Sequence, residues 1–381
     1  MERFDVVVVG ARVAGAATAL LLARQGLRVA VVDRARRGDD TNSTHALMRG
    51  GTALLQRWGL LDRVVAAGTP AIRQTLFSYP HESSTVSIKP AAGVDALYAP
   101  RRTVLDPILV DAATAAGAEV RYGVAVTDLT RDATGRVTGI LGRDRAGRVV
   151  EMAAGLVVGA DGRDSFVARR AGARTERTGA GASACVYGYW SGLPTIGYEW
   201  YYRPGGTAGL IPTNDGQVCV FAGLPAPRFA AEVRGDLAGL YRRVLKEVTG
   251  GADGRLAAEP PRRLRAFPGR PGFSRQAWGP GWALVGDAGY YVDPLSTHGM
   301  TDALRDAQLL AWAAVAAHDG EPEVAAYADF QCRRDAITEP MFAIVDQICS
   351  YTWDGPGIRR LLLQMSSAMS DEVEAILAAD A

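Results

Sequence analysis

Residues 6–15 read VVVVGARVAG and lead into an Ala- and Leu-rich segment that ends near Gly26. Four consecutive valines predict a buried strand, and the segment that follows Gly15 predicts a helix. In a strand–turn–helix unit the first glycine makes the tight turn, and the last lets helix and strand pack closely. The N-terminus of such a helix presents unpaired N–H groups to a pyrophosphate. The stretch therefore predicts a dinucleotide-binding fold.

The second strand, residues 27–32, ends at Asp33. A carboxylate about 20 residues beyond the glycine turn is placed to accept hydrogen bonds from ribose hydroxyls. Arg12 is a departure, because it occupies the middle position at which a glycine usually permits close approach of the backbone to the phosphates. We expect the Arg12 side chain either to point away from the phosphates or to meet them as a counter-charge.

Another turn lies far from the first. Residues 282–285 predict a strand that runs into Gly286-Asp287-Ala288, and the segment DPLSTHGM (293–300) then opens a long helix. A nicotinamide dehydrogenase would keep the first turn but has no reason to carry this one. The pair of turns therefore favours a flavoenzyme.

The composition is typical of a soluble enzyme with two or three domains: 381 residues, 48% hydrophobic, 22% charged and a net charge of +1. So small a net charge gives no electrostatic footprint for nucleic acid or for an anionic membrane. No apolar run reaches membrane-spanning length, and the first strand begins by Val6, which leaves no room for a signal peptide. We expect a cytoplasmic protein without membrane insertion.

Cysteine and histidine usage predicts no metal site. Cys185, Cys219, Cys332 and Cys349 show no C-x-x-C spacing, and the histidines do not cluster with them. We expect reduced, mostly structural thiols.

The coarse pattern predicts interleaved domains, because no linker separates autonomous halves. We expect short strands over residues 73–98, a strand over 119–126 and a sheet over 182–224. One amphipathic helix is expected from roughly residue 228 to 248, and mostly helices after the Gly286-Asp287 turn.

Three motifs support a named resemblance. The glycine turn with Asp33, the Ala160-Asp161-Gly162 turn, and Gly286-Asp287 with Pro294 and Gly299 together resemble the flavoprotein aromatic hydroxylases typified by p-hydroxybenzoate hydroxylase. Flavin-dependent halogenases and geranylgeranyl reductases share this scaffold. The WxWxIP signature of many halogenases is absent from the sequence, which disfavours that class.

The resemblance implies an α/β protein in which a Rossmann-like FAD-binding domain is interleaved with a mixed β-sheet substrate domain, followed by a helical C-terminus. The predicted FAD-binding domain comprises residues 1–73, 99–175 and 271–318; the substrate-binding domain comprises 74–98 and 176–270; the C-terminal helical segment is 319–381.

The resemblance also assigns cofactor contacts, position by position. The pyrophosphate would lie on the Gly10–Gly15 turn, the adenosine ribose on Asp33 and the ribitol on Asp287. The full set of implied FAD contacts is Gly10, Arg12, Val13, Ala14, Gly15, Asp33, Arg34, Thr44, His45, Arg102, Val126, Asp161, Gly286, Asp287, Pro294, Thr297, His298, Gly299 and Met300.

Several of these positions carry a more specific role in the family. Arg102 would reach the flavin side of the cofactor, Val126 the adenine, and Asp161 both FAD and the reduced nicotinamide. The backbone of residues 295–300 would meet the pyrimidine edge of the flavin, with a helix N-terminus stabilising negative charge there. Tyr290, in place of a common family histidine, and Thr301, where asparagine is frequent, depart from the pattern.

The implied chemistry is reduction of FAD by NADH or NADPH, reaction of the reduced flavin with O2 at C4a, and transfer of one oxygen atom to an aromatic or apolar small molecule. The cofactor carries the difficult step, while the protein orients the reactants and excludes water. The alternatives are a prenyl-chain reductase or an oxidase on the same fold, and a non-catalytic FAD-binding protein. A monomer or a homodimer fits equally well.

His298 and His45 are the predicted catalytic residues. His298 lies inside the flavin-facing turn and could donate a hydrogen bond to reduced flavin or to substrate; the alternative is a structural role in the turn. His45, next to Thr44, could approach the isoalloxazine from the other side; the alternative is a solvent-facing loop residue.

Aromatic residues gather in strand-like segments and supply the predicted substrate contacts. Tyr198, Trp200 and Tyr202 share one face at a period of two, and such a face above the flavin would suit a flat substrate. Ile211 and Pro212 would border the same pocket. The alternative for all five is ordinary filling of a domain core or a strand end.

Overall fold

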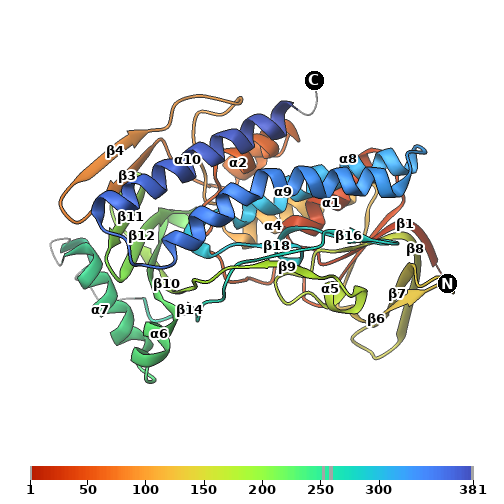
Figure 1. Ribbon diagram of the computed structural model, residues 1–381, viewed down its shortest axis with the longest axis horizontal. Helices are drawn as coiled ribbons and strands as arrows, with labels where there is room; N and C mark the ends of the chain where they lie inside the picture. Colours follow the sequence, from red (N-terminus) through yellow and green to blue (C-terminus); the bar gives the residue numbers. More distant parts are fainter. Residues whose placement is uncertain (1, 251–253, 257–260, 379–381) are drawn as a thin grey trace.

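The computed structural model describes residues 2–250, 254–256 and 261–378 of the chain. Its strands form two large sheets and a small one, and helices pack on both large sheets (Figure 1). This arrangement confirms the predicted α/β fold with a helical C-terminus. Among the described helices, none is long and apolar enough to cross a membrane.

The first sheet is built around the four-valine run. Its strands are β1 (Glu2–Val9), β2 (Val29–Asp33), β5 (Glu119–Tyr122), β6 (Ala125–Arg131), β7 (Val137–Arg143), β8 (Val149–Gly159), β16 (Trp278–Gly279) and β17 (Trp282–Leu284). The order is β16-β17-β8-β1-β2-β5, and the antiparallel strands β7 and β6 extend from β8. Residues 6–9 pair in parallel with β2 on one side and β8 on the other, so this strand is central and buried.

Helices and strands cover opposite faces of this sheet. One face packs on α1 (Val13–Arg24), α4 (Arg102–Ala115) and α8 (Gly299–His318), with α2 (Arg49–Arg57) and α3 (Leu61–Ala66) at the edge. The other face packs on β6, β7 and α5 (Phe166–Ala171). Both turns of interest therefore lie at the carboxyl ends of parallel strands, where α/β folds bind their ligands.

The second sheet has one aromatic face and one aliphatic face. Its strands, in order, are β14 (Arg265–Phe267), β10 (Ser183–Ser191), β13 (Gln217–Pro225), β12 (Gly206–Pro212), β11 (Tyr198–Arg203), β3 (Gln74–Ser78) and β4 (Ser83–Ser87). The aliphatic face packs on α7 (Leu237–Thr249) and α6 (Ala226–Glu232). The aromatic face packs on α9 (Glu323–Ile348) and α10 (Gly355–Ala378).

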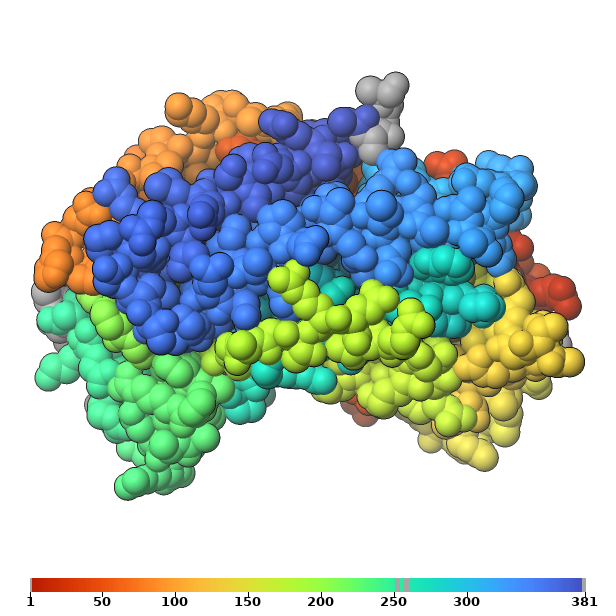
Figure 2. Space-filling model, in the orientation of Figure 1, coloured from red at the N-terminus to blue at the C-terminus, as the bar shows by residue number. Residues whose placement is uncertain are grey.

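The two large sheets are tied together by chain crossings and by the last helices. The small sheet of β18 (Tyr290–Tyr291), β15 (Phe273–Arg275) and β9 (Thr175–Thr178) lies along this connection. Figure 2 shows α9 and α10, in blue, crossing much of one face of the molecule. Because α10 contacts both α2 and β11, the C-terminal helices join the two lobes.

Two predicted elements are divided in the structure. The helix expected over residues 228–248 is α6 followed by α7, because Arg234 (φ +30°) and Gly235 (φ +80°) adopt left-handed backbone that a right-handed helix does not contain. The strand expected over 119–126 is β5 followed by β6, with Gly123 at φ +77° between them. The division of the chain into discontinuous domains by residue number remains a prediction.

Candidate functional site

The first turn requires glycine for steric reasons. Gly10 has φ +110°, and a Cβ at this residue would lie 2.4 Å from the backbone oxygen of Ala160, at the end of β8. A Cβ at Gly15 would lie 1.8 Å from the backbone oxygen of Gly10. In the described chain, no side chain caps the N-terminus of α1, so its first N–H groups are available to a phosphate.

Asp33 holds this turn in place. Its Oδ2 accepts a hydrogen bond from the N–H of Ala11 (2.8 Å), and its Oδ1 accepts one from the N–H of Ala35 (2.7 Å). The carboxylate thus lies at the glycine turn, where the sequence places the ribose contact. Arg34, the next residue, is exposed.

Two guanidinium groups share one carboxylate near the same turn. Arg102 donates to Asp106 from Nε (2.7 Å) and Nη2 (3.0 Å), and Arg12 Nη1 lies 3.9 Å from Asp106 Oδ2. Arg12 Nη1 is buried and has no hydrogen-bond partner within the described ranges. The excess of positive charge favours the alternative in which Arg12 serves as a counter-charge to a diphosphate.

The second turn meets the first. A Cβ at Gly286 (φ +57°) would lie 3.0 Å from the Ala14 side chain and 3.5 Å from that of Ala303, so this glycine sits between α1 and α8. The carboxylate of Asp287 is partly buried and accepts no hydrogen bond from the described residues. Burial, with a smaller contribution from Asp302, raises the pKa of Asp287 to about 6. An unsatisfied carboxylate here fits a polyol hydroxyl, so the residues suit FAD.

The flavin-facing turn is fixed to the second sheet by Asp293. Its Oδ1 accepts from the N–H of Leu295 (3.0 Å), and its Oδ2 accepts from the N–H of Ser183 (2.6 Å), the first residue of β10. Thr297 adopts left-handed backbone (φ +53°), and α8 begins at Gly299. The turn therefore connects the cofactor lobe to the aromatic sheet through one buried carboxylate.

His298 is buried in this turn and paired with the C-terminal helix. Its Nε2 contacts Glu372 Oε2, whereas its Nδ1 has no partner in the part of the chain that the structure describes. Burial opposes protonation, but Glu372 and Asp302 outweigh it and raise the pKa of His298. Glu372 and Asp302 thus favour the protonated imidazole, and its Nδ1 remains without a partner among the described residues.

A cluster of potential metal ligands surrounds His298. Ligand atoms of His298, Asp302 and Glu372 all lie within 4.8 Å of one another, a grouping that the sequence did not predict. The guanidinium of Arg305 contacts both carboxylates and also donates to Asp306 Oδ1 (2.8 Å from Nη2). Because Arg305 already supplies a cation to this cluster, we interpret it as an ion-pair network.

His45 is a buried, neutral residue. It has left-handed backbone (φ +71°), and its Nε2 contacts the hydroxyl of Tyr189. The guanidinium carbon of Arg101 lies 4.0 Å from the centroid of the same Tyr189 ring. Burial, then Arg102 and Arg101, lower the pKa of His45 to about 3. Its solvent-facing alternative is wrong, since the residue is 1% exposed. A neutral imidazole can orient a hydrogen bond but is not an acid at neutral pH.

Other predicted cofactor contacts occupy supporting positions. Asp161 accepts from the N–H groups of Phe166 (2.6 Å) and Val167 (3.1 Å), so its carboxylate serves the N-terminus of α5. Val126 lies on β6, at the edge of the core below the sheet. Tyr290, which stands in place of the common family histidine, donates a hydrogen bond from its hydroxyl to the backbone oxygen of Thr338 (3.2 Å).

Four of the five predicted substrate residues share one face of the second sheet. Tyr198, Trp200, Tyr202 and Ile211 belong to the aromatic core beneath α9 and α10, and Pro212 ends β12 beside them. The Tyr198 hydroxyl donates to the backbone oxygen of Tyr98 (2.7 Å). A narrow recess lies closer to the flavin-facing turn and is lined by Thr44, Ser183, Cys185, Phe221, Asp293, Pro294 and Leu295. The sequence did not predict Ser183, Cys185 and Phe221 as site residues.

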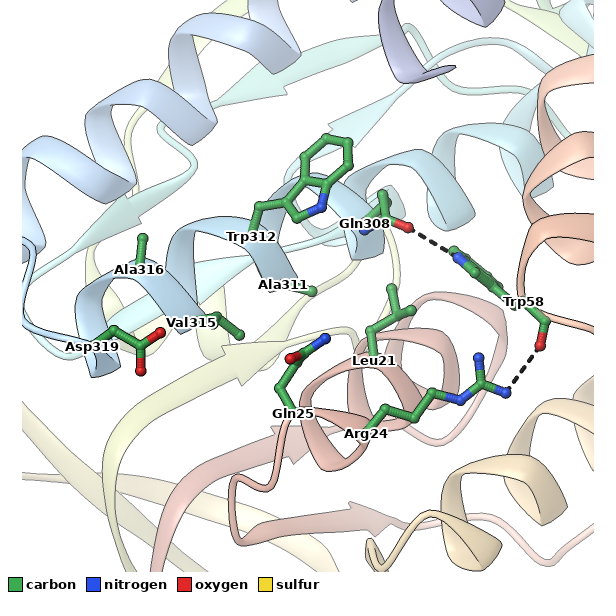
Figure 3. Close-up of a pocket in the computed structure, with 10 residues that line it drawn as sticks. All are labelled: Leu21, Arg24, Gln25, Trp58, Gln308, Ala311, Trp312, Val315, Ala316 and Asp319. Atoms are coloured by element: carbon green, nitrogen blue, oxygen red, sulfur yellow. Dashed lines mark hydrogen bonds between the residues drawn. The ribbon is translucent and has the colours of Figure 1, made fainter. Parts of the chain in front are cut away.

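A separate groove of about 470 Å³ lies between α1 and α8 (Figure 3). Trp58 Nε1 donates to Gln308 Oε1 (2.9 Å) at its wall, and Arg24 donates to the backbone oxygen of Trp58 (2.9 Å). Its walls come from the C-terminal halves of α1 and α8, whereas both nucleotide turns lie at the N-termini of these helices. The groove is therefore distinct from the cofactor site.

The fold, the two glycine turns and the waiting carboxylate at Asp287 define an FAD-dependent oxidoreductase. The chain belongs to the FAD binding domain family, whose sequence profile matches residues 3–343.

Named relatives include both reductases and monooxygenases. The chain is 31% identical over 339 residues to menaquinone reductase of Mycolicibacterium smegmatis, a match that covers 81% of this chain and 76% of that protein. It is 38% identical over 187 residues to monooxygenase cfoF of Aspergillus candidus, which covers 44% of this chain and 45% of that one. P. aeruginosa PqsL in complex with 2-aminobenzoylacetate superposes with a TM-score of 0.82 at 24% identity, covering 95% of this chain and 100% of that chain. This last likeness shows the shared fold.

The unpaired carboxylate of Asp287 and its raised pKa give a first prediction. We expect Asp287→Ala to weaken FAD binding by about 1–3 kcal/mol, because a buried hydrogen bond is lost. The pKa of Asp287 is raised on folding, so its ionisation destabilises the cofactor-free chain as pH rises from about 4 to about 6. The cofactor-free variant should therefore be more stable than wild type at pH 8 but not at pH 4.

Both effects are measured on cofactor-free protein, by FAD titration and by thermal unfolding at the two pH values. Asp371→Ala, which changes an exposed carboxylate on α10, is the control and should alter neither quantity. A folded Asp287→Ala variant with wild-type FAD affinity would remove Asp287 from the cofactor site.

His45 gives a second prediction. Its pKa falls from 6.5 in the unfolded chain to about 3 in the folded one, so its contribution to stability is intact above pH 6.5 and is lost as pH falls toward 3. Between pH 7.5 and pH 5 the wild type should lose about 2 kcal/mol of unfolding free energy that His45→Asn does not lose. Urea unfolding at both pH values measures this, with exposed His81→Asn as the control. Equal pH slopes for wild type and His45→Asn would show that His45 takes up a proton in the folded state.

Proposed function

We propose that the chain is an NAD(P)H-dependent FAD monooxygenase that adds one oxygen atom from O2 to a flat aromatic or polycyclic small molecule. The observation that carries this proposal is the junction between the aromatic sheet face and the flavin-facing turn. Phe221 and Cys185 line a recess with Pro294 and Leu295, and the Phe221 ring lies 6.1 Å from that of Trp200. An aromatic side chain such as Phe221 packs well against a planar apolar molecule, which is the reason for proposing that class of substrate.

Bound FAD would supply the electron transfer and the activation of O2. The chain would orient the substrate and keep water away from the flavin. Asp293 fixes the turn against β10, so the recess and the cofactor turn keep a constant separation. Cys185, Phe221, Pro294 and Leu295 form the apolar part of the recess wall, and Thr44, Ser183 and Asp293 form its polar part. The balanced reaction consumes substrate–H, O2, NAD(P)H and a proton, and yields substrate–OH, NAD(P)⁺ and water.

A second function has its own support. The match to menaquinone reductase extends over most of both chains, whereas the match to the monooxygenase spans less than half of each. In a reductase the same site would deliver a hydride to a double bond or a quinone, and no oxygen atom would enter the product. The two functions share one FAD-binding site and differ in the molecule that binds at the recess.

Isotope incorporation distinguishes these functions. Purified FAD-loaded protein is supplied with NADH or NADPH, 18O2 and a panel of phenols, anilines and polycyclic aromatic compounds, and products are analysed by mass spectrometry. We expect a product that contains one 18O atom, formed with consumption of one NAD(P)H. A menaquinone analogue reduced without oxygen, with no 18O product from any compound, would replace the proposal with the reductase. Hydrogen peroxide with a dehydrogenated product would indicate an oxidase.

His298 supplies a prediction within this function. We expect His298→Ala to bind FAD within about 1 kcal/mol of wild type, because its side chain accounts for at most one hydrogen bond to the cofactor. The fraction of NAD(P)H consumption that yields product should fall several-fold. Exposed His318→Ala, at the far end of α8, is the matched control. Unchanged coupling in His298→Ala would leave this histidine with a structural role in the turn.

A further inference from the structure

Glu372 is a charged residue on an apolar helix stripe. Helix α10 presents Ile358, Leu362, Met365, Met369 and Ile376 at spacings of three and four residues, and Glu372 occupies the same stripe. The side chain is 3% exposed. Because burying a carboxylate is costly without compensating partners, its position calls for a specific reason.

Glu372 contacts the flavin-facing turn directly and the Gly286 turn through two other side chains. Its Oε2 contacts His298 Nε2 in the flavin-facing turn, and its Oε1 accepts from Arg305 Nη1 (2.8 Å). Arg305 also binds Asp306, whose Oδ2 accepts the N–H of Gly286 (2.9 Å). The carboxylate therefore connects the C-terminal helix to the loop at His298 and, through two more side chains, to the turn before Asp287.

Two glycines let α2 pack closely: Gly50 against α8 and α10, and Gly51 against Leu47 and α8. A Cβ at Gly50, on α2, would lie 3.1 Å from Thr301 Cγ2 and 3.9 Å from Glu372 Oε2. A Cβ at Gly51 would lie 2.4 Å from the Leu47 side chain and 3.0 Å from Thr301 Oγ1. The packing of α2, α8 and α10 thus seats Glu372 against His298 with little space to move.

The contact with Glu372 decides which nitrogen of His298 is available. Nε2 is committed to the carboxylate, so the remaining nitrogen, Nδ1, is the one without a partner among the described residues, although the ring is 1% exposed. Charged groups from both neighbouring helices favour the protonated ring: Glu372 from α10 and Asp302 from α8, against the guanidinium of Arg305.

We propose that Glu372 is a positioning residue: it holds the His298 ring through Nε2 and leaves Nδ1–H as the donor that would be available to bound FAD. Such a donor interacts more strongly with the negative charge of reduced flavin than with the oxidised ring. Glu372 thereby raises the midpoint potential of the cofactor without touching it. The inference rests on FAD binding and holds equally for a monooxygenase and a reductase.

The test measures the flavin potential in a conservative variant. Glu372→Gln keeps the shape of the side chain and removes its charge. We expect its preference for reduced over oxidised FAD to fall about tenfold, equal to a midpoint potential lower by about 30 mV for a two-electron couple. In cofactor-free protein labelled with 15N-histidine, the titration of His298 should move to lower pH in the variant. Ile376→Val, a packing change on the same stripe, should leave both quantities unchanged.

A double-mutant cycle separates positioning from simple packing. His298→Asn should lower the potential by a similar amount, and Glu372→Gln should add nothing in that background, because it acts through the imidazole. If Glu372→Gln does not fold, His298→Asn alone still tests whether the ring affects the potential. A folded Glu372→Gln variant with a wild-type potential and reduced thermal stability would overturn the proposal and leave a purely structural ion pair.

Discussion

The close approach of α1 to the ends of β1 and β8 is the constraint on which the cofactor site depends. Gly15 lies against the backbone of Gly10, and Gly286 fits between Ala14 and the helix that follows the second turn. A methyl group at Gly10 or Gly15 would collide with backbone atoms that cannot move aside. These contacts bring two turns from distant parts of the chain to one place, with a helix N-terminus from each.

The aromatic sheet is positioned by that same centre. Asp293 accepts a hydrogen bond from the N–H of Ser183 at the start of β10, so the flavin-facing turn holds the beginning of this strand of the second sheet. Helices α9 and α10 then cover the aromatic face and return to the first lobe. A change in the tilt of the second sheet would therefore disturb the turn and the helical layer together, which favours a fixed recess wall over a mobile one.

Local motifs account for what could be predicted, and long-range packing accounts for what could not. The turns at Gly10 and Gly286 and the acid at Asp33 follow from short patterns whose steric needs are local. Phe221 and Cys185 were missed, because no spacing tells which sheet residues face a turn that comes much later in the chain. Glu372 did leave a signal, a carboxylate on an apolar stripe, yet its partner His298 is 74 residues away. Gly235 was a signal that the helix expected over residues 228–248 is interrupted. The apolar spacing typical of a helix continues after this glycine, so the interruption was not predicted.

The placement of Glu372 on the last described helix has a consequence for biosynthesis. A ribosome makes the glycine turn among its first residues, but the carboxylate that completes the surroundings of His298 is made only when α10 is translated. A nascent chain can form the glycine turn early, while the flavin-facing turn still lacks the contact between His298 and Glu372. The surroundings of His298 are therefore completed only late in translation, after every residue of the two nucleotide turns has been made.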